Sequence, residues 1–129
     1  MSTSKNRGLF ENIAPILNVK NFAASLEYYE NVLGFERGEW VTEDLLIGYV
    51  ERDGFGIYLS QEGQGHPGTW LWIGLKALDP LYEEFQTAGA NIVMEPTNFH
   101  WAWEMRIQDP DGHVIRFAAE PREDLPFVA

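Results

Sequence analysis

Apolar residues along the first half of the chain recur first with a helical period and then with a strand period. Between Asn21, which can cap a helix, and Gly34, which can end one, the apolar positions fall at helical spacing. They are Phe22, Leu26, Tyr29, Val32 and Leu33. Short apolar runs predict strands over 13–19, 45–50 and 55–59, with a weaker strand over 36–43. The Asp53-Gly54 pair between two of these runs predicts a hairpin turn.

The second half follows the same order. Strands are predicted over 70–75, 90–94 and 113–118, and a longer strand or hairpin arm over 99–108. Asp79 is placed to cap a helix with Pro80 at its first position, and Gly89 is placed to end it. Pro96 is expected to stop the strand before it. The glycine-rich stretch 61–69 is predicted to be a connection between the halves, because no phosphate-binding pattern follows it.

The two halves form an internal repeat. The helix-ending residues Gly34 and Gly89 are 55 positions apart, and the Asp53-Gly54 and Asp111-Gly112 turns are 58 apart. The spacing predicts an α+β fold in which two tandem β-α-β-β-β modules form curved mixed sheets around a cleft. We expect one domain over 1–129, with module one at 9–62, module two at 68–120 and a surface tail at 121–129.

Composition narrows the possible functions. The chain has 129 residues, no cysteine and a formal net charge of −11. A disulfide scaffold, a thiolate metal site and a cysteine nucleophile are excluded, and the acidic balance argues against nucleic-acid binding. No apolar run approaches the roughly 20 residues of a membrane span, and residues 1–8 lack the apolar stretch of a signal peptide. We therefore expect a cytoplasmic protein that binds neither nucleic acid nor membranes.

Three stretches of the chain resemble the vicinal oxygen chelate superfamily of glyoxalase I, bleomycin-resistance proteins and extradiol dioxygenases. They are residues 14–19 (Ala-Pro-Ile-Leu-Asn-Val), residues 25–35 with a Ser-Leu…Tyr…Leu-Gly-Phe pattern, and residues 109–117, which begin Asp-Pro-Asp-Gly. The resemblance covers about Ile13 to Glu120. It implies paired β-α-β-β-β modules and a homodimer.

Enzymes of that superfamily hold a divalent metal, and the flanking motifs locate the ligand positions in this chain. These positions fall on Ala14, Tyr58, Trp70 and Arg116, none of which is a ligand for such a cation. The three histidines, His66, His100 and His113, are expected in surface or packing roles. The resemblance therefore implies no metal and no cofactor in this chain.

The metal-free bleomycin-resistance branch is the part of the superfamily that the chain resembles most. Residues 70–85, with a Trp-Leu-Trp start, and residues 101–107, which begin Trp-Ala-Trp-Glu, resemble segments of that branch. The resemblance implies sequestration, without chemistry, of a cationic aromatic glycopeptide antibiotic at a dimer interface. Trp70 and Trp101 are the first candidates for ligand contact. The further candidates are Trp72, Trp103, Tyr49, Trp40 and Glu104.

Strand parity supports this interpretation. Trp70 and Trp72 are two residues apart and share one sheet face, as do Trp101 and Trp103, so four indoles can line a cleft if both faces are concave. Glu104 is expected on the opposite face from Trp103. Indoles stack on flat rings, and an acidic rim would attract a cationic ligand. No catalytic nucleophile–base pair is visible. Two alternatives stay open: a small enzyme of the same fold acting on an unidentified metabolite, and a sensor or accessory binding module.

Overall fold

The computed structural model of the chain describes residues 7–39, 44, 46–61 and 63–128. The first half contains β1 (Ile16–Asn18), α1 (Phe22–Asn31), β2 (Glu36–Arg37), β3 (Ile47–Arg52) and β4 (Phe55–Ser60). Its strands form one sheet in the order β1-β4-β3-β2, in which β1 runs parallel to β4 and the other pairs are antiparallel. The β-α-β-β-β order predicted for this half is confirmed.

The second half repeats this topology. It contains β5 (Trp70–Gly74), α2 (Asp79–Ala88), β6 (Ile92–Asn98), β7 (Trp103–Gln108) and β8 (Val114–Ala119). The strand order is β5-β8-β7-β6, again with the first strand parallel to the last and the other pairs antiparallel. The chain is therefore an α+β protein of two β-α-β-β-β modules, each with a four-stranded mixed sheet, as the internal repeat predicts.

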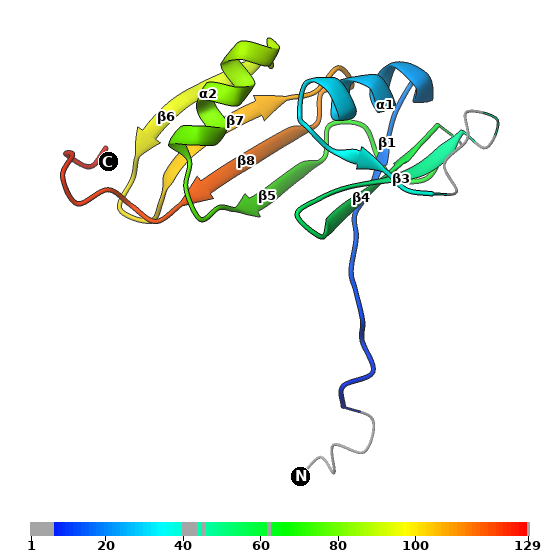
Figure 1. The fold of residues 1–129 in the computed structure, drawn as a ribbon, viewed down its shortest axis with the longest axis horizontal. Helices are drawn as coiled ribbons and strands as arrows, with labels where there is room; N and C mark the ends of the chain where they lie inside the picture. The colour runs from blue at the N-terminus through cyan, green and yellow to red at the C-terminus, as the bar shows by residue number, and fades with distance from the viewer. Residues whose placement is uncertain (1–6, 40–43, 45, 62, 129) are drawn as a thin grey trace.

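Each helix packs on one side of a sheet, and the apolar side chains between them form a single cluster (Figure 1). Asn21 caps α1 as expected, since its side chain accepts a hydrogen bond from the Ala24 amide at 2.9 Å. The predicted apolar face of α1 is confirmed, with Tyr29 and Leu33 fully buried. Phe85 is the buried residue of α2 and meets Phe117 of β8 edge to edge at 5.2 Å.

Three local predictions differ from the structure. Asp79 is the first residue of α2 and not its cap, because its side chain instead accepts a hydrogen bond from Trp103 Nε1 at 2.8 Å. Pro96 does not stop β6, which continues to Asn98, because β6 is an edge strand with a register shift between Met94 and Thr97. The strand expected over 99–108 begins only at Trp103.

Buried polar contacts join the two modules. His113, just before β8 in module two, is fully buried, and its ring accepts from the Thr69 amide through Nδ1 at 3.0 Å. With Nδ1 accepting, Nε2 carries the proton and donates to the Asn18 carbonyl at 2.6 Å. The Tyr29 hydroxyl donates to Asp109 Oδ2 at 2.7 Å. These contacts give His113 a packing role, as expected, and fix module one against the turn between β7 and β8.

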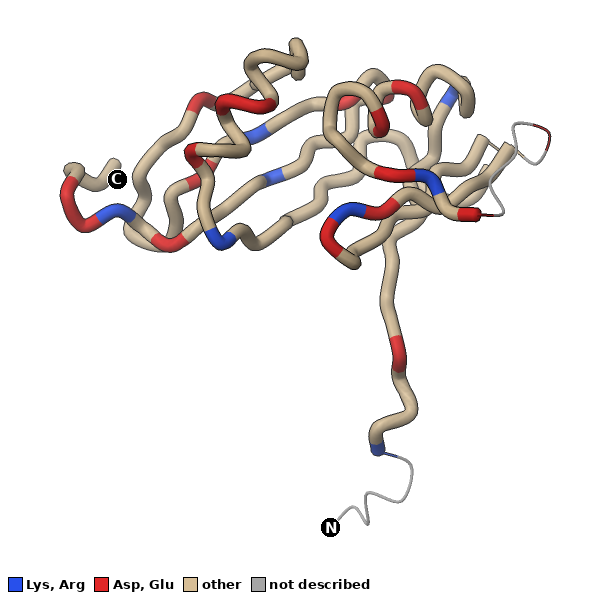
Figure 2. Tube along the Cα trace, viewed as in Figure 1, with Lys and Arg blue, Asp and Glu red and all other residues tan. Residues whose placement is uncertain are grey.

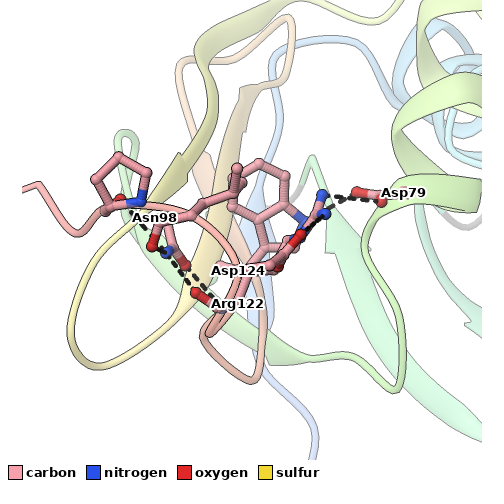
Figure 3. A network of polar contacts seen from close by, with 7 residues as sticks. Asp79, Asn98, Arg122 and Asp124 are labelled. Atoms are coloured by element: carbon pink, nitrogen blue, oxygen red, sulfur yellow. Dashed lines mark hydrogen bonds and ion pairs between the residues drawn. The ribbon is translucent and has the colours of Figure 1, made fainter.

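The tail after β8 is held at the other end of the second sheet. The buried Asn98 side chain donates to the carbonyls of Arg122 at 2.8 Å and Leu125 at 3.1 Å, and accepts from the Arg122 amide at 2.8 Å (Figure 3). The Arg122 guanidinium in turn pairs with Asp124 at 2.5 Å. The buried amide side chain of Asn98 thus helps to hold the tail along the end of β6, beside the backbone bond from the Val128 amide to the Asn98 carbonyl at 2.7 Å.

No helix in the described part of the chain is long and apolar enough to cross a membrane. Residues 7–13 extend away from both sheets in Figure 1.

Candidate functional site

The second sheet presents aromatic surface on the side away from α2. Trp70 lies opposite Val114 in the register and Trp72 lies opposite Arg116, so both indoles emerge on one side of the sheet. They are 57% and 61% exposed. The intervening residues Leu71 and Ile73 point the other way and pack on the core. The predicted shared face of Trp70 and Trp72 is therefore confirmed.

Three charged residues occupy the same side of the sheet, which we call the open face and define by Trp70, Trp72, Glu104, Arg106 and Arg116. The Glu104 side chain is fully buried. Arg116 binds its two carboxylate oxygens through Nε and Nη2, each at 2.9 Å, and Arg106 Nε binds one of them at 2.8 Å. The open face thus carries one more positive than negative charge.

The burial of Glu104 and its ion pairs act in opposite directions on its pKa. Burial raises the pKa of this carboxyl, but the hydrogen bonds from Arg116 and Arg106 and their positive charges outweigh burial. The pKa of Glu104 therefore lies below its ordinary value. Its hydrogen bond also raises the pKa of the Arg116 guanidinium. Glu104 and Arg116 are therefore both charged at neutral pH.

Arg106 also lies against an indole. Its guanidinium carbon is 5.5 Å from the centre of the Trp70 ring, a cation–π distance. Beside this pair is an open hollow of about 330 Å³. Its lining residues are Trp70, Val93, Met94, Arg106, Gln108 and Val114. None of these lining residues is acidic. The basic positions on β7 and β8 stand out in Figure 2 within an otherwise acidic chain.

The other predicted tryptophans lie elsewhere. Trp103 starts β7 but faces α2, where it donates to Asp79 and packs partly on the core. Trp101 precedes β7, is 60% exposed and stacks on Phe99 at 4.7 Å. Trp101 lies beyond one end of β7 and Trp70 lies level with the other end. The length of β7, about 17 Å at the usual rise of a strand, therefore separates the two residues. The expectation that four indoles line one cleft is therefore wrong.

The remaining candidates are divided between the two sheets. Glu104 lies on the face opposite Trp103, as predicted, and holds the two arginines of the open face. Tyr49 lies on β3 of the first sheet, against Tyr58 at 4.9 Å. Its ring covers Gly56, where a Cβ atom would come within 1.9 Å of the ring. Trp40 lies outside the described residues.

The donor set does not fit the divalent metal that the fold family implies. Tyr58, Trp70 and Arg116 supply no ordinary ligand, and Ala14 supplies no side-chain donor. The only carboxylate beside Arg116 on the open face, Glu104, already binds two guanidinium groups. Among the residues that the structure describes, no three His, Asp or Glu side chains are grouped to hold a metal ion.

Sequence reasoning missed Arg106 as a site residue. Its signal was present in β7, where the polar residues Glu104, Arg106 and Gln108 alternate with the apolar Met105 and Ile107. That alternation assigns the polar set to the open side.

Comparisons with known proteins identify the family. The family model of the Glyoxalase/Bleomycin resistance protein/Dioxygenase superfamily matches residues 11–117. The chain belongs to this superfamily. A search of curated proteins finds no match.

Solved structures share the fold at low sequence identity. TioX from Micromonospora sp. ML1 has a TM-score of 0.74 at 16% identity, over 86% of this chain and 99% of TioX. TnmS3 from Streptomyces sp. CB03234, described as an antibiotic binding protein, has a TM-score of 0.72 at 18% identity, over 88% and 98%. A virulence protein from Salmonella typhimurium has a TM-score of 0.68 at 24% identity, over 87% and 98%. At these identities the likeness shows the fold alone.

Proposed function

We propose that this protein binds a flat aromatic small molecule on the open face, without a metal, and sequesters the ligand rather than transforming it. The observation that carries the proposal is the pair of indoles on one side of β5, each more than half exposed. Exposed large apolar side chains grouped on a rigid sheet are typical of a binding surface. We propose that the protein acts in the cytoplasm, because a chain without cysteines forms no disulfide and does not depend on an oxidising compartment.

The physical basis is ring stacking on a preformed platform. A ring stacked on an indole gains about 1–3 kcal/mol, if base–aromatic stacking is a fair guide. Trp70 and Trp72 are fixed by the strand register, so little ordering is lost when a ligand arrives. Two such contacts give about 2–6 kcal/mol, and burial of the apolar surface of the ring must supply the rest of the about 8 kcal/mol that corresponds to micromolar binding.

The ligand class follows in part from the relatives. TnmS3 is described as an antibiotic binding protein, and the superfamily name includes bleomycin resistance. We propose an aromatic antibiotic as the ligand class for this chain too. The rings of a bleomycin-type glycopeptide suit the indoles, but its cationic end would meet the net positive charge of Arg106, Arg116 and Glu104.

A homodimer would complete the site. The open face of one module is uncovered in the single chain, and the first sheet carries its own aromatic surface at Tyr49 and Tyr58. We propose that two chains pair so that these surfaces enclose the ligand. Sedimentation velocity should give twice the chain mass of 14.8 kDa, and a monomer at micromolar concentration would oppose this part of the proposal.

The test of the binding function is a Trp70→Ala variant. Bleomycin, 2-naphthoate and 2-naphthylmethylammonium serve as probes, followed by calorimetry and by indole NMR signals. We expect at least one probe to bind with micromolar affinity and Trp70→Ala to weaken it about tenfold or more.

The matched control is Trp101→Ala, an equally exposed indole at the other end of the sheet. We expect it to keep the affinity for a naphthalene-sized probe. Equal affinities of the Trp70→Ala variant and the unaltered protein would remove the open face as the site. A tightly bound stoichiometric metal ion in protein purified without chelator would contradict the metal-free proposal.

A further inference from the structure

We propose that the site selects aromatic acids, and that Arg106 is the residue that reads the acidic group. The inference rests on the proposed function, because it assigns a ligand charge to the same open face. It is opposite in sign to the cationic ligand that the sequence resemblance implies. The argument depends on which hydrogen-bonding groups of the open face are already used and which are not.

Glu104 is not available to a ligand. Its side chain is fully buried, and its oxygens already accept three hydrogen bonds from Arg106 and Arg116. An ammonium group on a ligand would therefore find no free carboxylate among the described residues that line the hollow. A cationic ligand would instead be repelled by two guanidinium groups at close range.

Arg106 has hydrogen-bond donors that Glu104 does not use. Arg116 uses Nε and Nη2 in a two-pronged contact with Glu104, whereas Arg106 uses only Nε. Among the described residues, no hydrogen bond is made to either terminal nitrogen of Arg106. The Arg106 side chain is 27% exposed and lines the hollow, so these donors can reach a ligand. A carboxylate fits the planar geometry of a guanidinium group.

The placement of Arg106 matches one ligand shape. Its guanidinium carbon lies 5.5 Å from the centre of the Trp70 ring, and Trp70 is the same indole that would hold an aromatic ring of the ligand. A ring on Trp70 therefore brings a carboxylate on its edge close to Arg106. Gln108 lines the same hollow and offers an amide donor. Stacking of the ligand ring on Trp70 supplies the affinity, and Arg106 selects a negatively charged ligand over a positively charged one.

The chain's net charge of −11 does not override this local preference. At physiological salt the Debye length is about 8 Å, so exposed acidic groups farther away are largely screened. A contact at hydrogen-bond distance is screened much less. The distant charge should slow the approach of an acid and leave its bound state intact.

The experiment compares two probes that share one ring and differ in charge. Calorimetry at fixed ionic strength measures 2-naphthoate and 2-naphthylmethylammonium binding to the unaltered protein. We expect the acid to bind at least about tenfold more tightly, the range of one charge-assisted hydrogen bond. Arg106→Gln should abolish this preference, and Arg106→Lys should keep part of it. Circular dichroism checks that the variants are folded.

The matched control is Arg122→Gln. Arg122 also lies over an indole, 5.4 Å from the centre of the Trp103 ring, but on the α2 side of the sheet. We expect this variant to keep the tenfold preference. Equal or tighter binding of the ammonium probe to the unaltered protein, lost in Trp70→Ala, would overturn the inference and leave the proposed function standing. Failure of both naphthalene probes to bind would overturn the inference, and failure of bleomycin to bind as well would also overturn the proposed function.

Discussion

Removing the charge of Glu104 should destabilise the fold, and the structure allows the cost to be worked out. Glu104→Gln keeps the shape of the side chain but leaves Arg106 and Arg116 without their anion. Breaking one side of a buried ion pair costs about 3–5 kcal/mol. The two arginine side chains are 27% and 31% exposed and regain hydration, so we expect a loss of about 2–3 kcal/mol here.

The assay is urea unfolding followed by tryptophan fluorescence, with thermal melting alongside. For a chain of this length each kcal/mol corresponds to about 3–4 °C in melting temperature, so Glu104→Gln should melt about 6–12 °C lower. A double-mutant cycle with Arg116→Gln should show that most of the loss is shared between the two residues.

The same variant should also change the pH dependence of stability. Because the folded pKa of Glu104 is below its ordinary value, its stabilisation is present above the unfolded pKa of about 4.3 and is lost as the pH falls through the folded value. Glu104→Gln should lack that contribution, so its deficit should shrink toward pH 3. A loss under about 0.5 kcal/mol at pH 7, within the range of an ordinary surface substitution, would refute the reasoning.

Two further predictions concern the module contacts and the tail. Tyr29→Phe removes the hydroxyl that donates to Asp109, whose pKa burial raises, and should cost about 1.5–3 kcal/mol at pH 7 in urea unfolding. Since that bond favours ionised Asp109, the deficit should be smaller near pH 4; a deficit independent of pH would contradict this. Asn98→Ala should release the tail, so trypsin should cut after Arg122 several-fold faster by mass spectrometry. Asn91→Ala is the control, and equal cleavage rates would show that Asn98 does not hold the tail.

Much of the fold could be predicted because the repeat, the helix periods and the turn residues agree. The boundaries that differ have local causes. Pro96 is tolerated within β6 because that strand lies at the edge of its sheet. Asp79 does not cap α2 because its side chain accepts a hydrogen bond from the Trp103 indole, which is close in space but distant in sequence. Neither cause is visible until the strands are placed beside one another.

The candidate site was only partly predictable. Parity correctly paired Trp70 with Trp72, but four consecutive apolar residues in β5 give no polar signal that says which side faces the helix. In β7 the signal exists, because Trp103 shares its parity with the buried Met105 and Ile107. Trp103 is a cleft candidate only through the parity that it shares with Trp101, and the apolar pattern of β7 places it on the core side instead. The sign of the local charge depends on pairings between β7 and β8, which no single strand reveals.

The contacts between the modules have a consequence for how the chain folds. The bonds of His113 to Asn18 and of Tyr29 to Asp109 join residues 95 and 80 positions apart. Each half can form its hairpins quickly, but these contacts close only after most of the chain has been synthesised. Docking of the halves is therefore expected to be the slow step of folding. Until it occurs, the apolar surface that each half shares with the other is exposed to association with other chains.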